Sequence, residues 1–283
     1  MAVKFIIDSA SDVLPAEAKQ LGVTHLPMKV LFGEREYADA VSLSHQEFYE
    51  MLASDAEHPT TSQITPGEFA AAYEEVTSQG DTAVVITVSS KLSGTYQSAV
   101  IAAHDYRGKV FVVDSLSATI GERLLLQRGL ELAKEHLTAE EIACRLDEEK
   151  HRVRIFAYVD TLEYLKKGGR ISATTAVVGG LLNIKPIITV EDGLVVTAGK
   201  ARGAKQGNSL LRELALKGNG FDFDRPFALA FSGASDEGLR SFVRDNEDLW
   251  QGHEDSLSVA TVGCVIGAHA GPGAVALGFF EKE

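Results

Sequence analysis

Short apolar runs rich in β-branched residues recur along the chain, and amphipathic stretches of helical length separate most of them. The apolar runs are VKFII (3–7), AVVITV (83–88), KVFVVD (109–114), VRIFAYV (153–159), KPIITV (185–190), LVVTAG (194–199), FALAFSG (227–233), LSVATVG (257–263) and AVALGFF (274–280). The clearest amphipathic stretches are PGEFAAAYEEVTSQ (66–79), AEEIACRLDEEKHR (139–152) and DEGLRSFVRDNEDLW (236–250). The runs predict strands and the stretches predict helices. Their alternation indicates an α/β fold in which helices cover buried strands.

The second half of the chain departs from this alternation. In residues 188–202, two strand-like runs flank Asp192 and Gly193, a pair that favours the positive φ angles of a tight hairpin. A chain of 283 residues is long enough for two domains. We therefore expect an N-terminal three-layer α/β domain over residues 1–150 with a mostly parallel sheet. A C-terminal α/β domain with a mixed sheet is expected over residues 151–283.

A hydroxyl-rich loop connects a predicted strand to a predicted helix in TVSSKLSGTYQSA (87–99). Ser89, Ser90, Ser93 and Thr95 place four hydroxyl groups in this loop and at the start of the helix. The first amides of a helix lack partners within the helix and carry partial positive charge, so an anion could bind where Ser93 and Gly94 begin this one. An ordinary serine N-cap explains the same pattern, and the sequence leaves both interpretations open.

Two further segments carry candidate binding groups. In HPTTSQITPGEF (58–69), Thr65, Pro66 and Glu68 form a normal helix start that leaves Thr61 and Ser62 unexplained. The glycine-rich segment near the end of the chain contains His269, which is either a structural or a functional histidine. The nearly uncharged residues 171–184 favour a helix buried in a core, and the alternative is that their small side chains leave room for another apolar group.

Composition and charge exclude several classes of protein. Cys144 and Cys264 have neither disulfide-framework nor zinc spacing, and no nucleotide-phosphate loop or acidic metal cluster is found. A formal charge of −13 disfavours nucleic acid as a partner. The first residues show no signal-peptide pattern, and no run is long enough to cross a bilayer. A cytoplasmic protein without a cofactor is expected.

Six motifs occur in the order typical of one family. They are DSASD (8–12), TTSQITPGEF (60–69), SSKLSGTYQSA (89–99), LEYLKKGGRIS (162–172), NIKPII (183–188) and HAGPGAVALGF (269–279). Over essentially its whole length the chain resembles the bacterial DegV family of fatty-acid-binding proteins. The resemblance implies a long-chain fatty acid between two α/β domains. Its carboxylate is then expected at Thr61, Ser62, Ser93, the Gly94 amide and His269, with Arg170 nearby.

The resemblance also implies a carrier, not an enzyme. Proteins of this family present the fatty acid to a separate ATP-dependent kinase subunit, which forms an acyl-phosphate for phospholipid synthesis. Arg202 matches an arginine used to dock that kinase. Gly203 stands where the family often has threonine, and Ala268 and Ala270 flank His269 where hydroxyl residues are common.

A Ser/His acyl-transferring or hydrolytic enzyme is the alternative function. It would use Ser93 as nucleophile and His269 as base, with a backbone N–H after Ser93 as oxyanion donor. No carboxylate that would orient the histidine can be assigned, and the G-x-S-x-G motif of a strained nucleophile turn is missing.

Overall fold

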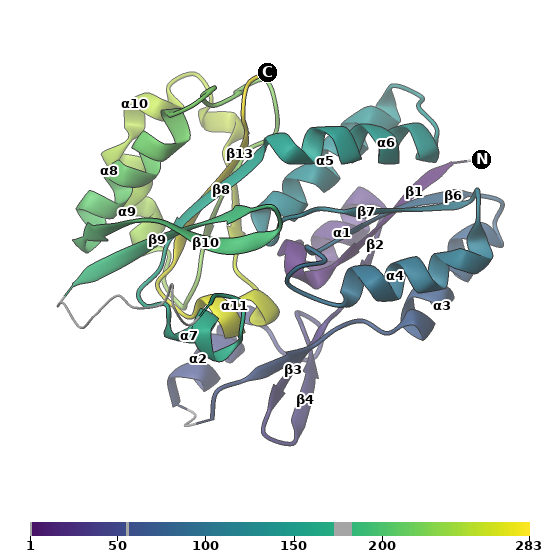
Figure 1. Cartoon of the computed structure of the whole chain (residues 1–283), viewed down its shortest axis with the longest axis horizontal. Coiled ribbons are helices and arrows are strands. Elements are labelled where there is room, and N and C mark those ends of the chain that lie inside the picture. The colour runs from purple at the N-terminus through teal and green to yellow at the C-terminus, as the bar shows by residue number, and fades with distance from the viewer. Residues whose placement is uncertain (1, 55–56, 173–182) are drawn as a thin grey trace.

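The computed structural model describes residues 2–54, 57–172 and 183–283 as an α/β fold with two main sheets (Figure 1). The first sheet is parallel throughout, with strand order β2-β1-β6-β7. Its strands are β1 (Val3–Asp8), β2 (Val23–Leu26), β6 (Thr82–Thr87) and β7 (Val110–Asp114). Every residue of β6 is buried, because helices cover both faces of a parallel sheet.

The second main sheet is mixed, with strand order β10-β9-β8-β13-β11-β12. Its strands are β8 (Val153–Tyr158), β9 (Ile184–Glu191), β10 (Leu194–Arg202), β11 (Ala228–Phe231), β12 (Ser258–Thr261) and β13 (Val275–Phe280). Only β11 and β12 pair in parallel among these neighbours. Asp192 and Gly193 both have positive φ and turn the chain between β9 and β10, so the predicted hairpin and mixed sheet are confirmed.

A smaller antiparallel sheet and a set of helices complete the described structure. The small sheet has the order β4-β3-β5, with β3 (Lys29–Phe32), β4 (Arg35–Ala38) and β5 (Thr60–Ser62). The α-helices are α1 (Pro15–Leu21), α2 (His45–Ser54), α3 (Pro66–Thr77), α4 (Thr95–Ala103), α5 (Ile120–Lys134), α6 (Ala139–Glu149), α7 (Glu163–Lys167), α8 (Gly203–Leu216), α9 (Glu237–Asp245), α10 (Glu247–Trp250) and α11 (Cys264–Ala270). The 3-10 turns are η1 (Ser9–Ser11), η2 (His104–Tyr106), η3 (Lys150–Arg152) and η4 (Glu254–Ser256).

Short-range hydrogen bonds explain where the predicted helices begin and end. Thr65 accepts the Glu68 N–H, and the Glu68 carboxylate accepts the Thr65 N–H, so a capping box starts α3 as the sequence predicts. Residues 236–250, predicted as a single amphipathic stretch, form two helices instead. Asn246 lies between the two helices, and its side-chain amide donates to Phe242 O at 2.8 Å, a side-chain bond to the backbone that competes with continuation of the helix.

Helix α5 packs between the two main sheets and joins their cores (Figure 1). Its Leu124 and Leu125 belong to one buried cluster with Ile7 of the parallel sheet and Ile155 of the mixed sheet. An added Cβ on Gly278 of β13 would lie 3.0 Å from Ile120, so this glycine lets helix and strand pack closely. The two sheets therefore share a continuous hydrophobic core.

The strands of the two main sheets come from separate stretches of the chain, but one helix crosses from one part to the other. The parallel sheet ends at residue 114 and the mixed sheet starts at residue 153. Helix α11 follows β12 in sequence yet packs against α2, β3 and β5 of the N-terminal part. The sequence predicts a buried helix in the run 171–184. Residues 173–182 of this run lie outside the described part of the chain, and so does the predicted helix. No helix among the described residues is both long and apolar enough to cross a membrane.

Candidate functional site

A cavity of about 350 Å³ lies between the parallel and the mixed sheet. The residues at the ends of β6 and η1 face it from one side, and strands β8, β9, β10 and β13 face it from the other. The apolar part of this second wall comprises Ile155, Ala157, Ile188, Val190, Val195 and Ala276. A cavity of this size and lining suits a small, largely apolar molecule.

Most polar side chains of the cavity lining come from four segments, and Thr61 and His269 among them are hydrogen-bonded to each other. The polar residues of these segments are Thr61, Ser62 and Gln63 of β5 and the residue after it, Ser93 before α4, Arg170 after α7, and His269 of α11. All six ligand-binding residues predicted from the sequence, including Gly94, are among the lining residues. Arg170 is the one formally charged side chain in the described lining apart from the titratable His269. The cavity therefore combines an apolar wall with a compact polar cluster.

Hydrogen bonds within its own backbone and to the β9–β10 hairpin hold the hydroxyl-rich loop before α4 in place. Ser89 is buried, and its hydroxyl donates to Gly193 O at 2.8 Å. The N–H groups of Leu92 and Ser93 donate to Ser89 O at 3.0 and 3.1 Å. Ser89 therefore has a structural role, and the loop presents Ser93 to the cavity in a defined position.

Ser93 and Gly94 form the start of α4. Ser93 Oγ accepts the Thr95 N–H at 3.2 Å and lies 2.9 Å from Thr95 Oγ1. Gly94 is the N-cap residue and supplies no side-chain acceptor to the first helical turn. An added Cβ on Gly94 would come within 2.8 Å of Gln63 Cδ, so glycine allows the Gln63 amide to lie over the helix start. Ser93 thus makes a local capping contact at a helix start that faces the cavity.

His269 lies in the last turn of α11 and reaches across to β5. Its Nε2 shares a hydrogen bond of 3.0 Å with Thr61 Oγ1. Its Nδ1 is buried and has no hydrogen-bond partner among the described residues. Burial, together with the nearby Arg170 and His58, lowers the pKa of His269 to about 4. The imidazole is therefore neutral at neutral pH and offers one donor and one acceptor nitrogen.

Arg170 is held by two backbone carbonyl groups beside the histidine. Its Nε donates to Leu92 O at 3.0 Å, and its Nη1 donates to Gly168 O at 2.6 Å. Burial lowers the pKa of this guanidinium, but the group stays charged at neutral pH. The two carbonyl groups therefore fix the position of the Arg170 guanidinium without a ligand.

Two residues of the site were not assigned by the sequence. Gln63 lines the cavity and its Nε2 donates to Ser98 Oγ at 2.8 Å, which fixes the amide beside Gly94. Gly168 has no room for a side chain, because an added Cβ would lie only 2.7 Å from His269 Cε1 and closer still to Nδ1. The TTSQ and GGR motifs contain both residues, but only the folded chain shows what lies opposite them.

Arg202 lies apart from this cluster. It is exposed, it is not among the cavity residues, and it ends β10 where α8 begins. Its backbone N–H donates to Gln206 Oε1 at 2.6 Å, and the Gly203 N–H donates to Asn183 O at 2.8 Å. The side chain is therefore available at the surface and not to a molecule in the cavity.

The hydrogen bonds do not form the pair that a Ser/His enzyme requires. Ser93 Oγ bonds to Thr95, and His269 Nε2 bonds to Thr61. No carboxylate bonds to His269 Nδ1 among the described residues. The same residues contain no group of three or more His, Cys, Asp or Glu arranged to hold a metal ion. The arrangement favours holding a ligand over attacking it.

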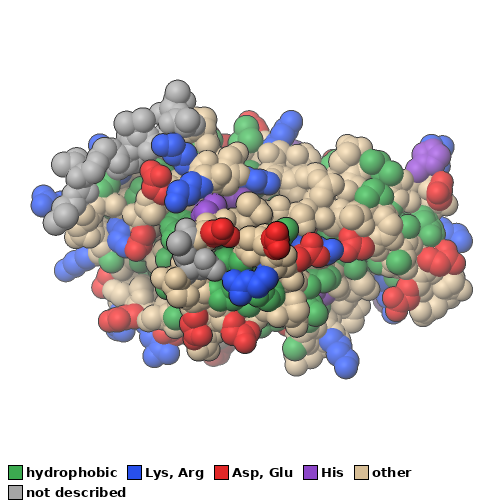
Figure 2. All heavy atoms as spheres, turned by 90° about the horizontal axis from the view of Figure 1, so that it is seen from below, with side chains coloured by type: hydrophobic (Ala, Val, Ile, Leu, Met, Phe, Trp, Pro, Cys, Tyr) green, Lys and Arg blue, Asp and Glu red, His purple; other side chains and the backbone are tan. Residues whose placement is uncertain are grey.

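One face of the molecule carries interspersed charges of both signs (Figure 2). The face shown in Figure 2 carries Lys, Arg, Asp and Glu side chains side by side with apolar ones. No field of a single sign covers that face, although the whole chain has a formal charge of −13.

Comparison with known proteins agrees with this geometry over the full length of the chain. The family model described as "Uncharacterised protein, DegV family" matches residues 2–282. A DegV domain-containing protein of Caldanaerobacter subterraneus is 33% identical over 284 residues, covering 99% of both chains. A fatty-acid-binding DegV family protein from Thermus thermophilus has a TM-score of 0.87 at 31% identity, covering 100% of both chains.

A stearic-acid-binding protein from Eubacterium ventriosum is also similar in structure. It has a TM-score of 0.86 at 29% identity and covers 100% of this chain and 99% of its own. The match of the family model over nearly every residue decides the assignment, and the structural neighbours share the whole two-sheet fold. This chain belongs to the DegV family.

Proposed function

We propose that the protein binds one long-chain fatty acid in the cavity between its two main sheets. The observation that carries this proposal is the composition of the lining: an apolar wall, one fixed cation, and neutral hydrogen-bonding groups around it. A single carboxylate on a long apolar chain matches both parts. The relatives from Thermus thermophilus and Eubacterium ventriosum, which bind a fatty acid and stearic acid, support the same ligand class.

The carboxylate is expected in the polar cluster. Thr61, Ser62 and Ser93 offer hydroxyl donors, and the Gly94 amide lies at the positive end of α4. Arg170 supplies the countercharge, since its guanidinium is already directed into this region by backbone carbonyl groups. In its neutral state His269 can donate one hydrogen bond without adding a second charge.

The acyl chain is expected along the wall formed by β8, β9, β10 and β13. Burying one methylene group contributes about 0.8 kcal/mol, so a tail of about 16 carbons supplies on the order of 12 kcal/mol before the entropy of binding is subtracted. A charged hydrogen bond at the head adds roughly 1.5 to 3 kcal/mol. The tail therefore sets most of the affinity, and the head sets the orientation.

We further propose that the protein is a carrier in the cytoplasm and not itself a catalyst. It would present the carboxylate to a separate ATP-binding kinase subunit, which would form an acyl-phosphate for phospholipid synthesis. The exposed side chain of Arg202, at the junction of β10 and α8, is proposed to dock that subunit. Gly203 has φ of 75°, a conformation that suits glycine better than the threonine common in the family, so docking here would rely on a different backbone geometry.

Residues 1–150 and 151–283 are proposed as the two domains that enclose the ligand. The distribution of strands between the parallel and the mixed sheet supports this division. Helix α11 would then be the part of the C-terminal domain that carries a head-group residue over to the N-terminal one.

The test is to measure ligand binding by the purified and delipidated chain. Denaturing mass spectrometry of an organic extract should find about one long-chain fatty acid per chain before delipidation. Calorimetry should then show uptake of palmitate or oleate. Hexadecyltrimethylammonium, which has the same tail and a cationic head, should bind much more weakly because Arg170 opposes it. Extracts without fatty acid, together with no uptake of either acid, would refute the proposal.

A further inference from the structure

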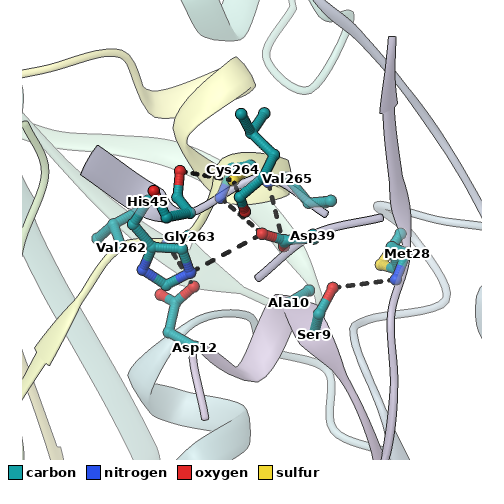
Figure 3. A network of polar contacts seen from close by, with 12 residues as sticks. Ser9, Ala10, Asp12, Met28, Asp39, His45, Val262, Gly263, Cys264 and Val265 are labelled. Atoms are coloured by element: carbon teal, nitrogen blue, oxygen red, sulfur yellow. Dashed lines mark hydrogen bonds and ion pairs between the residues drawn. The ribbon is translucent and has the colours of Figure 1, made fainter. Parts of the chain in front are cut away.

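Two buried aspartates near the start of the chain hold the first turn of α11 (Figure 3). Asp39 Oδ1 accepts the Cys264 N–H at 3.0 Å, and Asp39 Oδ2 accepts the Val265 N–H at 3.3 Å. Asp12 Oδ1 accepts the Gly263 N–H at 2.8 Å. The first N–H groups of a helix have no partners within it, so these two carboxylates satisfy donors that would otherwise be buried and unpaired.

The surroundings leave little room for this helix start to move. An added Cβ on Gly263 would lie 3.0 Å from both Asp12 Oδ1 and His45 Nε2. His45 Nε2 is itself 3.8 Å from Asp39 Oδ1, and the hydroxyl of Tyr49 donates to Val262 O at 3.0 Å. Side chains of the N-terminal part thus contact the beginning of α11 from several directions.

Helix α11 connects this anchored end to the polar cluster. Its seven residues span about 9 Å from first to last. Midway, Gly267 packs on α2 so closely that an added Cβ would lie 2.7 Å from Phe48 and from Tyr49. His269 follows in the last turn and bonds to Thr61. One short helix therefore joins the amides held by Asp39 and Asp12 to the imidazole.

We propose that Asp39 is a positioning residue of the head-group cluster, which holds His269 Nε2 against Thr61 Oγ1 through α11. Asp39 does not line the cavity, so its effect on a ligand must pass through the helix. This inference rests on the proposed function, because it assigns to Asp39 a role in orienting the fatty-acid head and none in holding the tail.

Affinities for palmitate and for 1-hexadecanol, measured on the delipidated full chain, separate these two roles. Asp39→Ala removes both acceptors and should weaken palmitate binding about 10-fold. Asp39→Asn keeps one acceptor oxygen and should recover most of that loss. The affinity for 1-hexadecanol, which has a tail of the same length without a carboxylate, should change less than about 2-fold in both variants.

A double-mutant cycle with His269→Ala tests the route. If Asp39 acts through His269, Asp39→Ala should change palmitate affinity less than about 2-fold once the imidazole is gone. Thr138→Ala is the matched control, because it removes the side-chain cap of α6, away from the cavity lining. It should leave palmitate affinity unchanged. If Asp39→Ala does not fold, Asp39→Ser takes its place in the cycle, because the shorter serine hydroxyl cannot accept both the Cys264 and the Val265 N–H.

Two results would overturn the inference alone. One is an equal loss of affinity for palmitate and hexadecanol, which would indicate a general loss of structure. The other is additivity of the Asp39 and His269 substitutions. A wild-type chain that binds neither ligand would overturn the proposed function, and this inference together with it.

Discussion

Replacing Gly168 by alanine is expected to weaken fatty-acid binding by displacing the imidazole of His269. Gly168 has an ordinary φ of −73°, so alanine meets no backbone strain there. The new Cβ would nevertheless lie 2.7 Å from His269 Cε1 and closer to Nδ1, whereas ordinary contacts begin at 3.4 Å. The ring must withdraw by roughly 0.7 Å or more.

The ring cannot withdraw directly. Its Nε2 already lies 3.0 Å from Thr61 Oγ1, so a shift in that direction produces a second clash. The side chain must instead rotate out of the hydrogen bond and lose its place at the head group. Losing one hydrogen bond to a charged ligand costs roughly 1.5 to 3 kcal/mol, which corresponds to an affinity loss of about 10- to 150-fold for palmitate.

Isothermal titration of delipidated protein with palmitate measures this loss. Gly67→Ala is the matched control, because Gly67 lies in the first turn of α3 and an added Cβ there meets only Thr65 Oγ1 at 4.0 Å. This control should keep its palmitate affinity, and both variants should unfold cooperatively near the wild-type temperature. Unchanged palmitate affinity in Gly168→Ala would refute the reasoning, since the ring would then have moved without consequence or not at all.

Three further predictions concern other parts of the molecule. Thr61→Ala and Ser93→Ala should each weaken palmitate binding about 10-fold, the lower end of the range for one hydrogen bond to a charged ligand. In calorimetry the double mutant should deviate from the sum of the two, because both hydroxyls would contact one head group; unchanged affinity in all three variants would remove this cluster from the head-group site. Arg202→Ala should bind palmitate normally but reduce acyl-phosphate formation in a coupled assay with the kinase subunit, whereas lost palmitate binding would place Arg202 in the cavity. Burial raises the pKa of Asp12 to about 7, so the folded state holds this proton more tightly than the unfolded state, and stability is lost as pH rises from about 4 through about 7. In urea unfolding, the free energy of unfolding of Asp12→Asn should therefore rise relative to that of the wild type as pH increases over that interval, by up to a few kcal/mol. A difference between the two proteins that does not depend on pH would contradict this.

Elements that depend on near neighbours in the chain were predicted well. The capping box of Thr65 and Glu68 and the turn at Asp192 and Gly193 form as expected, because each needs only residues within a few positions of one another. The small sheet β3-β4-β5 and helix α11 were not predicted. Strands of three or four residues carry little periodicity, and the glycines and alanines of α11 carry no amphipathic signal.

The sequence by itself determined the α/β class, the hairpin, the helix starts and the types of side chain available for a carboxylate. Only the tertiary structure decided which of them meet. Thr61 and His269 are 208 residues apart in the chain, and their hydrogen bond exists because α11 returns to the N-terminal part. Asp39 and Gly168 acquire their proposed roles for the same reason. Packing between distant segments decides which side chain lies beside a glycine and which amides a buried carboxylate satisfies. No local sequence pattern encodes that packing.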